Sequence, residues 1–439
     1  MIATPLVSRL MIYTALGAIV AGAAMPHPAM AASFYLQDQS VRGLGRAYSG
    51  EVADQGASSL WWNPAAIARS GGEIYIGEHT ILTSATVLDR GSTVTRAIPP
   101  AGLTTPVGGE GRAYNPIQVG VLPNGAFAIP IGDRFAFGVS VSAPYDFTSR
   151  YSSASFARYD SLKSRLTTID IAATGAVKVY GWLDLGAALN SEYTSATLTN
   201  ALPNLSPLSP DGQQSLKGDG WNYGYSVGAQ MHFGKLEAGV SYKSKMDHDL
   251  DGTVSASGLL APLAASNFNT PGSAHFSTPW IATVGARYHL TRHLTLNGQV
   301  QRLGWSEFDA ITVNYAGRTS ATPEHYRDST SGAVGVDYAV SPAWTLRAGV
   351  GYDATPTVTA YRDTRVPDSD RVLYTAGTSV KVRSNMTVDA AFGYVAFNGS
   401  SVNNTNVFYG GTAAQTVATN RAGVGANAKL LSLGLRYNF

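Results

Sequence analysis

The end of this 439-residue chain alternates apolar and polar residues one by one, and this feature restricts its fold more than any other. The apolar positions of the last segment are Leu431, Leu433, Leu435, Tyr437 and Phe439. Serine, glycine, arginine and asparagine occupy the positions between them. Because strand side chains alternate between two faces, this period of two predicts a β-strand with one apolar face.

Segments of this kind recur from Glu73 to the C-terminus, roughly fourteen in all and each about ten residues long. They begin near Glu73, Gln118, Arg134, Leu166, Trp182, Asn222, Lys235, Pro279, Leu294, Arg327, Trp344, Arg371, Met386 and Lys429. The connections between them alternate between a few residues and long stretches, such as residues 83–117 and 398–428. Short periplasmic turns and long outer loops are typical of transmembrane β-barrels, and an even strand number returns both chain ends to the periplasm.

Aromatic residues and a low charge distinguish a membrane barrel from a soluble β-sandwich, whose strands also alternate. Trp344 and Tyr352 lie at the two ends of one apolar face, as expected for a strand that crosses both lipid–water interfaces. Charged residues make up 14% of the chain, against roughly 25% in soluble domains. No run near 20 apolar residues follows the N-terminal region, which excludes a helical membrane protein. We therefore predict an all-β fold, a transmembrane antiparallel β-barrel.

The first 31 residues have the pattern of a secretory signal peptide. Arg9 supplies a positive charge, residues 10–24 form an apolar stretch, and Ala29-Met30-Ala31 fits the small-x-small cleavage rule. A helical membrane anchor is the alternative interpretation of this segment. Cleavage after Ala31 would export the chain, so we expect it in the outer membrane of a Gram-negative bacterium.

Residues 32–72 break the strand pattern, because they are rich in glycine, alanine and serine and have short helical stretches. About forty residues cannot build a useful core alone. They precede the first strand, on the periplasmic side of a barrel with a wide lumen. We therefore expect residues 32–72 to form a plug, or hatch, inside a barrel made by residues 73–439.

Several kinds of chemistry are disfavoured by the sequence. A net charge of +2 argues against an electrostatic nucleic-acid binder. The chain has no cysteine, and its histidines lack metal-ligand spacing, so we expect no metal site and no cofactor. Residues 224–228 spell G-x-S-x-G, but they lie inside an alternating strand rather than in the strand-turn-helix context of a nucleophile. We do not expect an enzyme.

Five motifs in register resemble those of the FadL/TodX outer-membrane transporters. Two lie in the expected hatch, at residues 40–51 (SVRGLGRAYSGE) and at residues 63–66 (NPAA). Three lie in the expected barrel: residues 242–245 (YKSK), residues 347–356 (RAGVGYDATP) and residues 366–371 (VPDSDR). The resemblance covers nearly the whole chain after the signal peptide.

The resemblance implies a monomeric fourteen-strand barrel with an N-terminal hatch that takes up hydrophobic molecules from outside. Apolar outer loops would capture the molecule, a lumen site against the hatch would bind it, and a kinked third strand would release it sideways into the membrane. Long-chain fatty acids are the expected substrate, with monoaromatic hydrocarbons as the alternative. The expected partners are thus a hydrophobic small molecule and outer-membrane lipid. An outer-membrane hydrolase and a general porin remain competing interpretations.

The resemblance also indicates candidate site residues. Phe34 corresponds to a phenylalanine that touches the lumen ligand, and Arg327 to a basic residue that binds the fatty-acid carboxylate. Arg327 has Asp328 beside it, so a paired lumen charge is the alternative. A second basic residue of the fatty-acid branch has no counterpart, because residues 190–198 contain neither lysine nor arginine. This difference leaves room for a neutral ligand.

The other candidates concern the hatch and the wall. Asn63, Pro64 and Ala65 form a turn in which the asparagine side chain can bond the exposed edge of a kinked strand, since backbone groups in lipid must be satisfied. Pro144 lies near the outer end of the third strand. Proline removes a ladder hydrogen bond, so Pro144 marks either the lateral opening or only the end of that strand.

Overall fold

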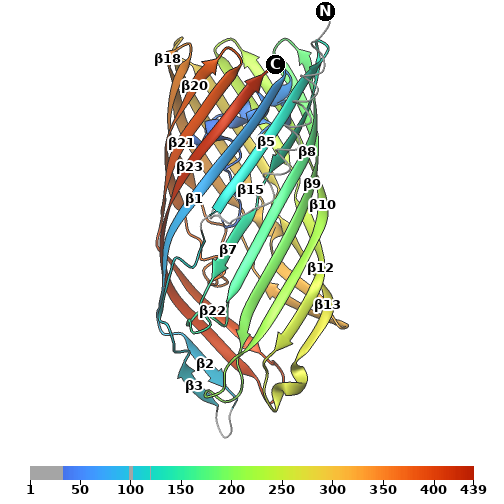
Figure 1. Ribbon diagram of the computed structural model, residues 1–439, viewed down its shortest axis with the longest axis vertical. Helices are drawn as coiled ribbons and strands as arrows, with labels where there is room; N and C mark the ends of the chain where they lie inside the picture. Colours follow the sequence, from blue (N-terminus) through green and yellow to red (C-terminus); the bar gives the residue numbers. More distant parts are fainter. Residues whose placement is uncertain (1–32, 98–101, 119) are drawn as a thin grey trace, which may run out of the picture.

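The computed structural model describes residues 33–97, 102–118 and 120–439, so the expected signal peptide lies outside the described residues. Across the described residues, fourteen antiparallel wall strands close into a barrel (Figure 1). The barrel closes between β1 and β23, which pair from Glu73–Asn438 to Asp89–Ala422. The predicted all-β transmembrane barrel is therefore confirmed.

The wall strands follow one another around the barrel in chain order. They are β1 (Glu73–Asp89), β5 (Gly120–Ile131), β6 (Phe135–Ser142), β8 (Lys163–Tyr180), β9 (Leu183–Leu202), β10 (Gly212–Phe233), β11 (Leu236–Lys243), β14 (Ile281–His289), β15 (Leu294–Leu303), β18 (Ser329–Ser341), β19 (Trp344–Asp353), β20 (Arg371–Arg383), β21 (Met386–Phe397) and β23 (Thr416–Asn438).

Further strands extend the barrel beyond the wall at one end. They are β2 (Thr93–Arg96), β3 (Leu103–Pro106), β4 (Arg112–Tyr114), β7 (Asp146–Arg150), β12 (Met246–Ser257), β13 (Phe268–Thr278), β16 (Ala310–Tyr315), β17 (Arg318–Pro323) and β22 (Ser400–Phe408). The short turns and the C-terminus lie at the opposite end, at the top of Figure 1. Because periplasmic turns are short and outer loops are long, the extended end faces the outside of the cell.

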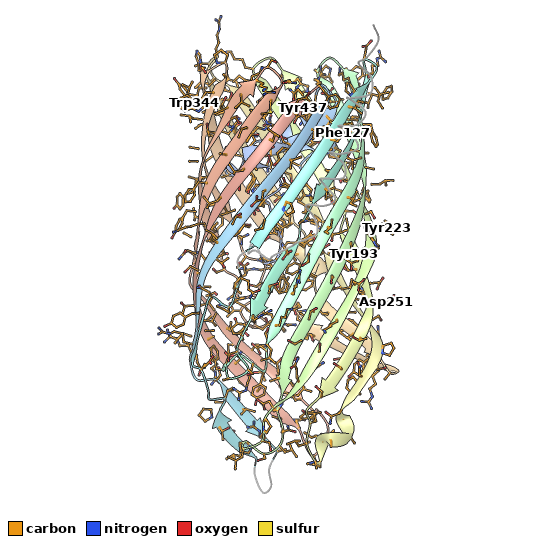
Figure 2. All side chains as sticks on the ribbon, in the orientation of Figure 1. Phe127, Tyr193, Tyr223, Asp251, Trp344 and Tyr437 are labelled. Atoms are coloured by element: carbon orange, nitrogen blue, oxygen red, sulfur yellow. The ribbon has the colours of Figure 1, made fainter. Side chains whose placement is uncertain are left out.

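The alternation seen in the sequence divides lipid-facing from lumen-facing side chains. Leu431 and Leu433 are exposed, whereas the adjacent residues Leu430 and Ser432 are buried. Trp344 and Tyr437 lie near the short-turn end, whereas Tyr193 and Tyr223 lie about halfway toward the loop end (Figure 2). Two aromatic girdles of this kind mark the two interfaces of a membrane-spanning barrel.

Residues 33–72 lie inside the barrel, where Figure 1 shows them as the blue ribbon near the short-turn end. They fold into one short helix, α2 (Val41–Leu44), and three 3₁₀ turns: η1 (Glu51–Ala53), η2 (Ala57–Ser59) and η3 (Pro64–Ile67). Ser40 caps α2, and Asn63 caps η3, each by accepting a backbone amide on its side chain. Most of these residues are buried, and their core is the barrel wall around them.

A belt of inward-facing glycines receives this N-terminal segment. A Cβ added at Gly186, Gly228, Gly239, Gly349 or Gly377 would collide with Ala65, Asn63, Val52, Arg46 or Gly45, respectively. These glycines come from β9, β10, β11, β19 and β20. The missing side chains allow the backbone of the segment to rest directly on the wall, which fixes its depth in the lumen.

A buried ion cluster ties the segment to the wall. The Arg46 guanidinium lies 3.1 Å from an oxygen of Asp337 on β18. The Arg287 guanidinium on β14 lies 3.0 Å from Asp54 in the segment and 3.0 Å from Asp337. Arg46 also lies 3.2 Å from Glu51. Because each buried charge has opposite charges beside it, removal of one partner leaves another uncompensated.

Candidate ligand site

Phe34 lies in a cluster of aromatic rings in the lumen and is only 2% exposed. Its ring centroid is 4.9 Å from that of Trp305 and 5.2 Å from that of Phe308. The rings of Tyr145 and Tyr326 lie at 5.9 Å and 6.5 Å. The N-terminal segment thus places its first aromatic side chain where strands and outer loops meet.

An apolar cavity of about 590 Å³ opens on the outer side of this cluster. Its lining is mostly aliphatic and aromatic: Phe34, Phe147, Leu166, Ala196, Leu198, Leu216, Val366, Leu250, Ala274, Phe276, Phe308, Ile311 and Tyr326. Each CH₂ group that moves from water into such a cavity gains about 0.8 kcal/mol. The cavity therefore suits a hydrophobic molecule, with Phe34 closing its inner end.

Four charged residues complete the cavity: Arg165, Glu324, Asp363 and Arg365. Arg365 lies 2.9 Å from Glu324 and also pairs with Asp363. Burial raises the pKa of Glu324, which lies in an outer loop, to about 7, although Arg365 opposes this shift. An arginine whose carboxylate partner protonates near neutral pH can exchange that partner for another anion.

Arg327, the basic residue singled out by the sequence, is exposed and does not line this cavity. Its backbone amide donates to the Pro356 carbonyl at 3.0 Å. The arginines that do line the cavity, Arg165 and Arg365, were missed. Arg165 is paired in register with Thr197 on β9, the strand in which the sequence lacks a basic residue. Strand β8 thus supplies a cation directly beside the part of β9 that has none.

A wider vestibule of about 1250 Å³ lies among the outer hairpins. Its lining mixes polar residues, such as Asn200 and Asn406, with apolar ones, such as Phe408. Leu198, Leu216, Ile311, Asp363 and Arg365 line both the vestibule and the apolar cavity. Arg365 and its carboxylates therefore stand between the outside and the apolar cavity.

The third wall strand is interrupted at Pro144, as the sequence suggested for this residue. β6 ends at Ser142 and its continuation β7 begins at Asp146. The N-terminal segment fills the break: the Leu36 amide donates to the Pro144 carbonyl at 2.8 Å, and the Asp146 amide donates to the Phe34 carbonyl at 3.1 Å. Residues 34–36 thus act as a short extra strand beside the interrupted one.

Gln39 closes the same break with its side chain. Its Nε2 donates to the Ala143 carbonyl at 3.0 Å, and its Oε1 accepts the Ala143 amide at 3.3 Å. These contacts satisfy backbone groups that the interruption would leave without strand partners, which lipid does not tolerate.

Asn63, Pro64 and Ala65 lie elsewhere, so the expectation that Asn63 bonds the kinked strand is corrected. Asn63 Oδ1 accepts the Ala65 amide at 2.9 Å, and its Nδ2 donates to the carbonyls of Val52 and of Ala229 on β10, at 2.7 and 3.1 Å. The turn rests on the glycine belt instead. It needs small residues and an amide side chain because it joins the segment to β9 and β10.

A smaller polar pocket of about 360 Å³ lies behind Tyr145. Trp61, Pro144 and Tyr145 line one part of it, and Asp170, Asn190, Glu192 and Lys243 line another. The Lys243 ammonium lies 4.6 Å from the Trp61 ring centroid. This pocket adjoins the interrupted strand at Pro144, and its Tyr145 also belongs to the ring cluster around Phe34.

Within ranges 33–97, 102–118 and 120–439, no cluster of three or more histidine or acidic side chains is arranged to hold a metal ion. In the same part of the chain, no helix is long and apolar enough to span a membrane.

A closed fourteen-strand barrel with a lumenal N-terminal segment and an apolar cavity defines the class of outer-membrane transporters of hydrophobic compounds. The family model described as "Outer membrane protein transport protein (OMPP1/FadL/TodX)" matches residues 22–439. The chain belongs to this family. It is accordingly an outer-membrane protein of a non-enzymatic channel family.

Relatives in the family carry different names. The chain is 25% identical over 435 residues to a "Long-chain fatty acid transport protein" of Escherichia coli O6:H1, covering 88% of this chain and 92% of the relative. It is 25% identical over 450 residues to "Outer membrane protein P1" of Haemophilus influenzae, covering 94% and 96%.

Solved structures show the same fold. A FadL homologue of Pseudomonas aeruginosa superposes with a TM-score of 0.79 at 24% identity, covering 93% of this chain and 100% of that one. The toluene transporter TodX of Pseudomonas putida superposes with a TM-score of 0.64 at 17% identity, covering 93% and 100%. At these identities the likeness concerns the fold alone.

Proposed function

We propose that this protein carries long-chain fatty acids passively across the outer membrane. The observation that carries the proposal is the apolar cavity, with Phe34 at its inner end and Arg165 and Arg365 among its few charged residues. An acyl chain gains free energy from every buried CH₂, and an arginine binds a carboxylate in a bidentate manner. The cavity thus offers apolar side chains to the acyl chain and a cationic side chain to the carboxylate.

Ligand binding at Arg365 takes the form of an exchange. In the absence of ligand, the guanidinium pairs with Glu324 and Asp363, so no cation is left uncompensated. A fatty-acid carboxylate displaces Glu324, which then accepts a proton readily because its pKa is about 7. Arg327, which is exposed, stays as a second candidate for the headgroup that the same assay can test.

Release is proposed to occur sideways at Pro144. On the lumen side, residues 34–36 and Gln39 close the break in the third strand, while Thr168 on β8 bonds the amide and carbonyl of Tyr145. Because Phe34 belongs to residues 34–36, its displacement by the ligand also moves the residues that close the break. The molecule then leaves between β5 and the interrupted strand into lipid, a step that a hydrophobic solute favours because it never meets water.

The hatch, residues 32–72, is proposed to stay in the barrel throughout, with Asn63, Pro64 and Ala65 keeping it seated. The glycine belt and the ion cluster would both have to be broken to remove it. We further propose that residues 1–31 are a cleaved signal peptide and that the barrel, residues 73–439, works as a monomer.

Uptake of monoaromatic hydrocarbons by the same route is the second candidate. One observation favours it: the charges at the cavity already satisfy one another, so the cavity needs no anionic ligand. Its inner end is also formed by rings, among them Phe34, Phe276 and Phe308, that suit a flat apolar molecule.

Uptake of labelled oleate and labelled toluene in cells lacking their own transporter separates the two. We expect oleate uptake with the wild type, a strong fall with Arg365→Gln and little change with Arg327→Ala. A fall with Arg327→Ala alone would move the headgroup site to that residue. Toluene uptake that ignores both changes, without oleate uptake, would favour the aromatic substrate. Uptake of neither, by correctly folded protein, would contradict both.

A further inference from the structure

A carboxyl group faces the lipid on the first wall strand. On β1 the even-numbered Ile76 and Leu82 are exposed, whereas the odd-numbered His79 is buried in the lumen. Glu78 shares the parity of the outward residues and is itself exposed. Its register partner on β23, Leu433, is also exposed. The side chain of Glu78 therefore points away from the lumen, among apolar neighbours.

Glu78 lies midway between the two aromatic girdles. Four residues before it, β1 is paired in register with Tyr437, which lies near the short-turn end in Figure 2. Four residues after it, β1 is paired with Lys429, whose partner on the other side is the exposed Tyr394. Four residues advance about 13 Å along a strand, or about 10 Å in depth at the usual strand tilt. The carboxyl thus lies at the depth of the hydrocarbon core.

Glu78 also lies beside the stretch where the wall is interrupted. The ladder from β5 to the third strand ends at Val141 and resumes with the bridge between Ser149 and Ile117. Between these points, Pro123 of β5 has its ladder partner on β1, and that partner is Glu78. β1 and β5 run side by side in Figure 1. The carboxyl is therefore one strand away from the opening proposed for release.

The carboxyl of Glu78 has hydrogen-bonding capacity to spare. The Thr80 hydroxyl on the same strand donates to Glu78 Oε1 at 2.8 Å. Within the three described ranges of the chain, Glu78 Oε2 accepts no hydrogen bond and no cation pairs with the carboxyl. A carboxyl that faces hydrocarbon is costly, and ionisable groups at this depth mark functional sites. Its missing partner must come from the membrane side.

We propose that Glu78 receives the protonated carboxyl group of a fatty acid as the acid leaves through the opening, an inference that rests on the proposed function. An ionised head group does not enter hydrocarbon without a counterion, so the acid departs as the neutral molecule. Its O–H donates to Glu78 Oε2, which replaces a hydrogen bond that hydrocarbon cannot offer. The carboxyl thereby lowers the cost of moving a polar head group through the middle of the membrane.

Glu324 supplies the proton for this departure. Bound fatty acid is a carboxylate paired with Arg365, while Glu324 carries the proton. When Glu324 pairs with Arg365 again, its carboxyl becomes a carboxylate and the fatty-acid carboxylate becomes the neutral acid. A permanently ionised head group, such as a sulfonate, can take up no proton and has no O–H for Glu78.

The test measures initial rates of labelled oleate uptake, over a range of concentrations, in cells lacking their own transporter. Glu78→Leu removes the acceptor, and Glu78→Gln keeps an acceptor oxygen. Ser191→Leu is the control, because Ser191 on β9 shares the parity of the exposed Leu189 and lies away from the opening. Oleate binding by the purified, full-length protein is measured in parallel, and heat-modifiable migration on gels confirms that each barrel is folded.

Glu78→Leu should lower the maximal uptake rate about tenfold, the effect of losing one strong hydrogen bond. Oleate binding should stay within about twofold of the wild type, because Glu78 lies outside the cavity. Glu78→Gln should keep most of the rate, and Ser191→Leu all of it. An unchanged maximal rate in Glu78→Leu, or a rate in Glu78→Gln as low as in Glu78→Leu, would overturn this inference alone. A wild type that takes up no oleate would overturn the proposed function as well.

Discussion

The Leu36 amide donates a hydrogen bond of 2.8 Å to the Pro144 carbonyl, which lies 108 positions further along the chain. Pro144 has no amide hydrogen of its own, so the interrupted strand cannot continue its ladder here. The N-terminal segment supplies the missing partner from inside the barrel. The same few residues carry Phe34 into the apolar cavity, so ligand binding and closure of the wall share one piece of chain.

Replacement of Gln39 by alanine should loosen this closure. The change leaves the amide and carbonyl of Ala143 without their partners, which costs about 1–3 kcal/mol locally. We expect faster hydrogen exchange of the amides around Ala143, measured by mass spectrometry. Gln55→Ala is the matched control, because no hydrogen bond of the Gln55 side chain is found among the described residues. Unchanged exchange in Gln39→Ala would show that Gln39 does not hold the wall.

Replacement of Gly228 by valine should unseat the hatch. The new Cβ collides with Asn63, and overpacking of this kind costs about 1–3 kcal/mol. We expect ion conductance in planar bilayers to rise above that of the wild type. Gly175→Val is the control, because nothing lies within 4 Å of a Cβ at that position. Equal conductance for both variants would argue against the glycine belt as the seat of the hatch.

Replacement of Asp337 by asparagine should destabilise the contact between segment and wall. Arg46 and Arg287 each lose a buried counterion, at a cost of about 3–5 kcal/mol. Limited proteolysis should then cut within residues 33–72. Asp328→Asn removes an exposed pair with Arg302 and should change stability by less than about 1 kcal/mol. Resistance of Asp337→Asn to protease would contradict the role of the ion cluster.

Anion binding at the cavity should strengthen as pH falls through about 7. Glu324 has a pKa near 7 because it is buried, so it is ionised and holds Arg365 above that pH and is protonated below it. One proton gives at most about tenfold per pH unit. An alkyl sulfonate, whose headgroup stays ionised, should bind more tightly at pH 6 than at pH 8.

The variant Glu324→Gln isolates this effect, since its side chain does not titrate. We expect tight sulfonate binding and a flat pH profile. A wild-type profile as flat as that of the variant would remove Glu324 from the exchange.

The same carboxyl also affects folding. A carboxyl whose folded pKa is raised binds its proton more tightly in the folded state, so Glu324 lowers stability as pH rises from about 4.5 to about 7. The effect levels off above pH 7. Thermal unfolding of wild type and Glu324→Gln over this range should therefore diverge as pH increases.

The wall was predictable because lipid outside and polar groups inside impose a strict alternation. The predicted starts at Trp344, Arg371 and Met386 coincide with β19, β20 and β21. β10 begins at Gly212 and β23 at Thr416, well before the predicted Asn222 and Lys429. Those first residues lie beyond the membrane, where both faces of a strand meet water and the alternation fades.

The site was less accessible to prediction. The family resemblance indicated Phe34, and proline chemistry indicated Pro144. Arg365 lies in a loop and meets Glu324, 41 positions away, only through the tertiary fold. Residues 34–39 carry no strand pattern of their own, because they pair with one strand over a few residues. Contacts of this kind leave no periodic signal in a sequence.

The most direct test of lateral release locks the wall shut. Next to the bridge between Tyr35 and Tyr145, Leu36 and Pro144 lie opposite each other. Opposed residues joined by such a hydrogen bond have Cα atoms about 5.5 Å apart, a separation that suits a disulfide. The chain has no cysteine, so Leu36→Cys with Pro144→Cys introduces the only pair. Labelled oleate uptake should stop when the disulfide forms and return on reduction. Equal uptake by the oxidised and reduced protein would contradict release through this opening.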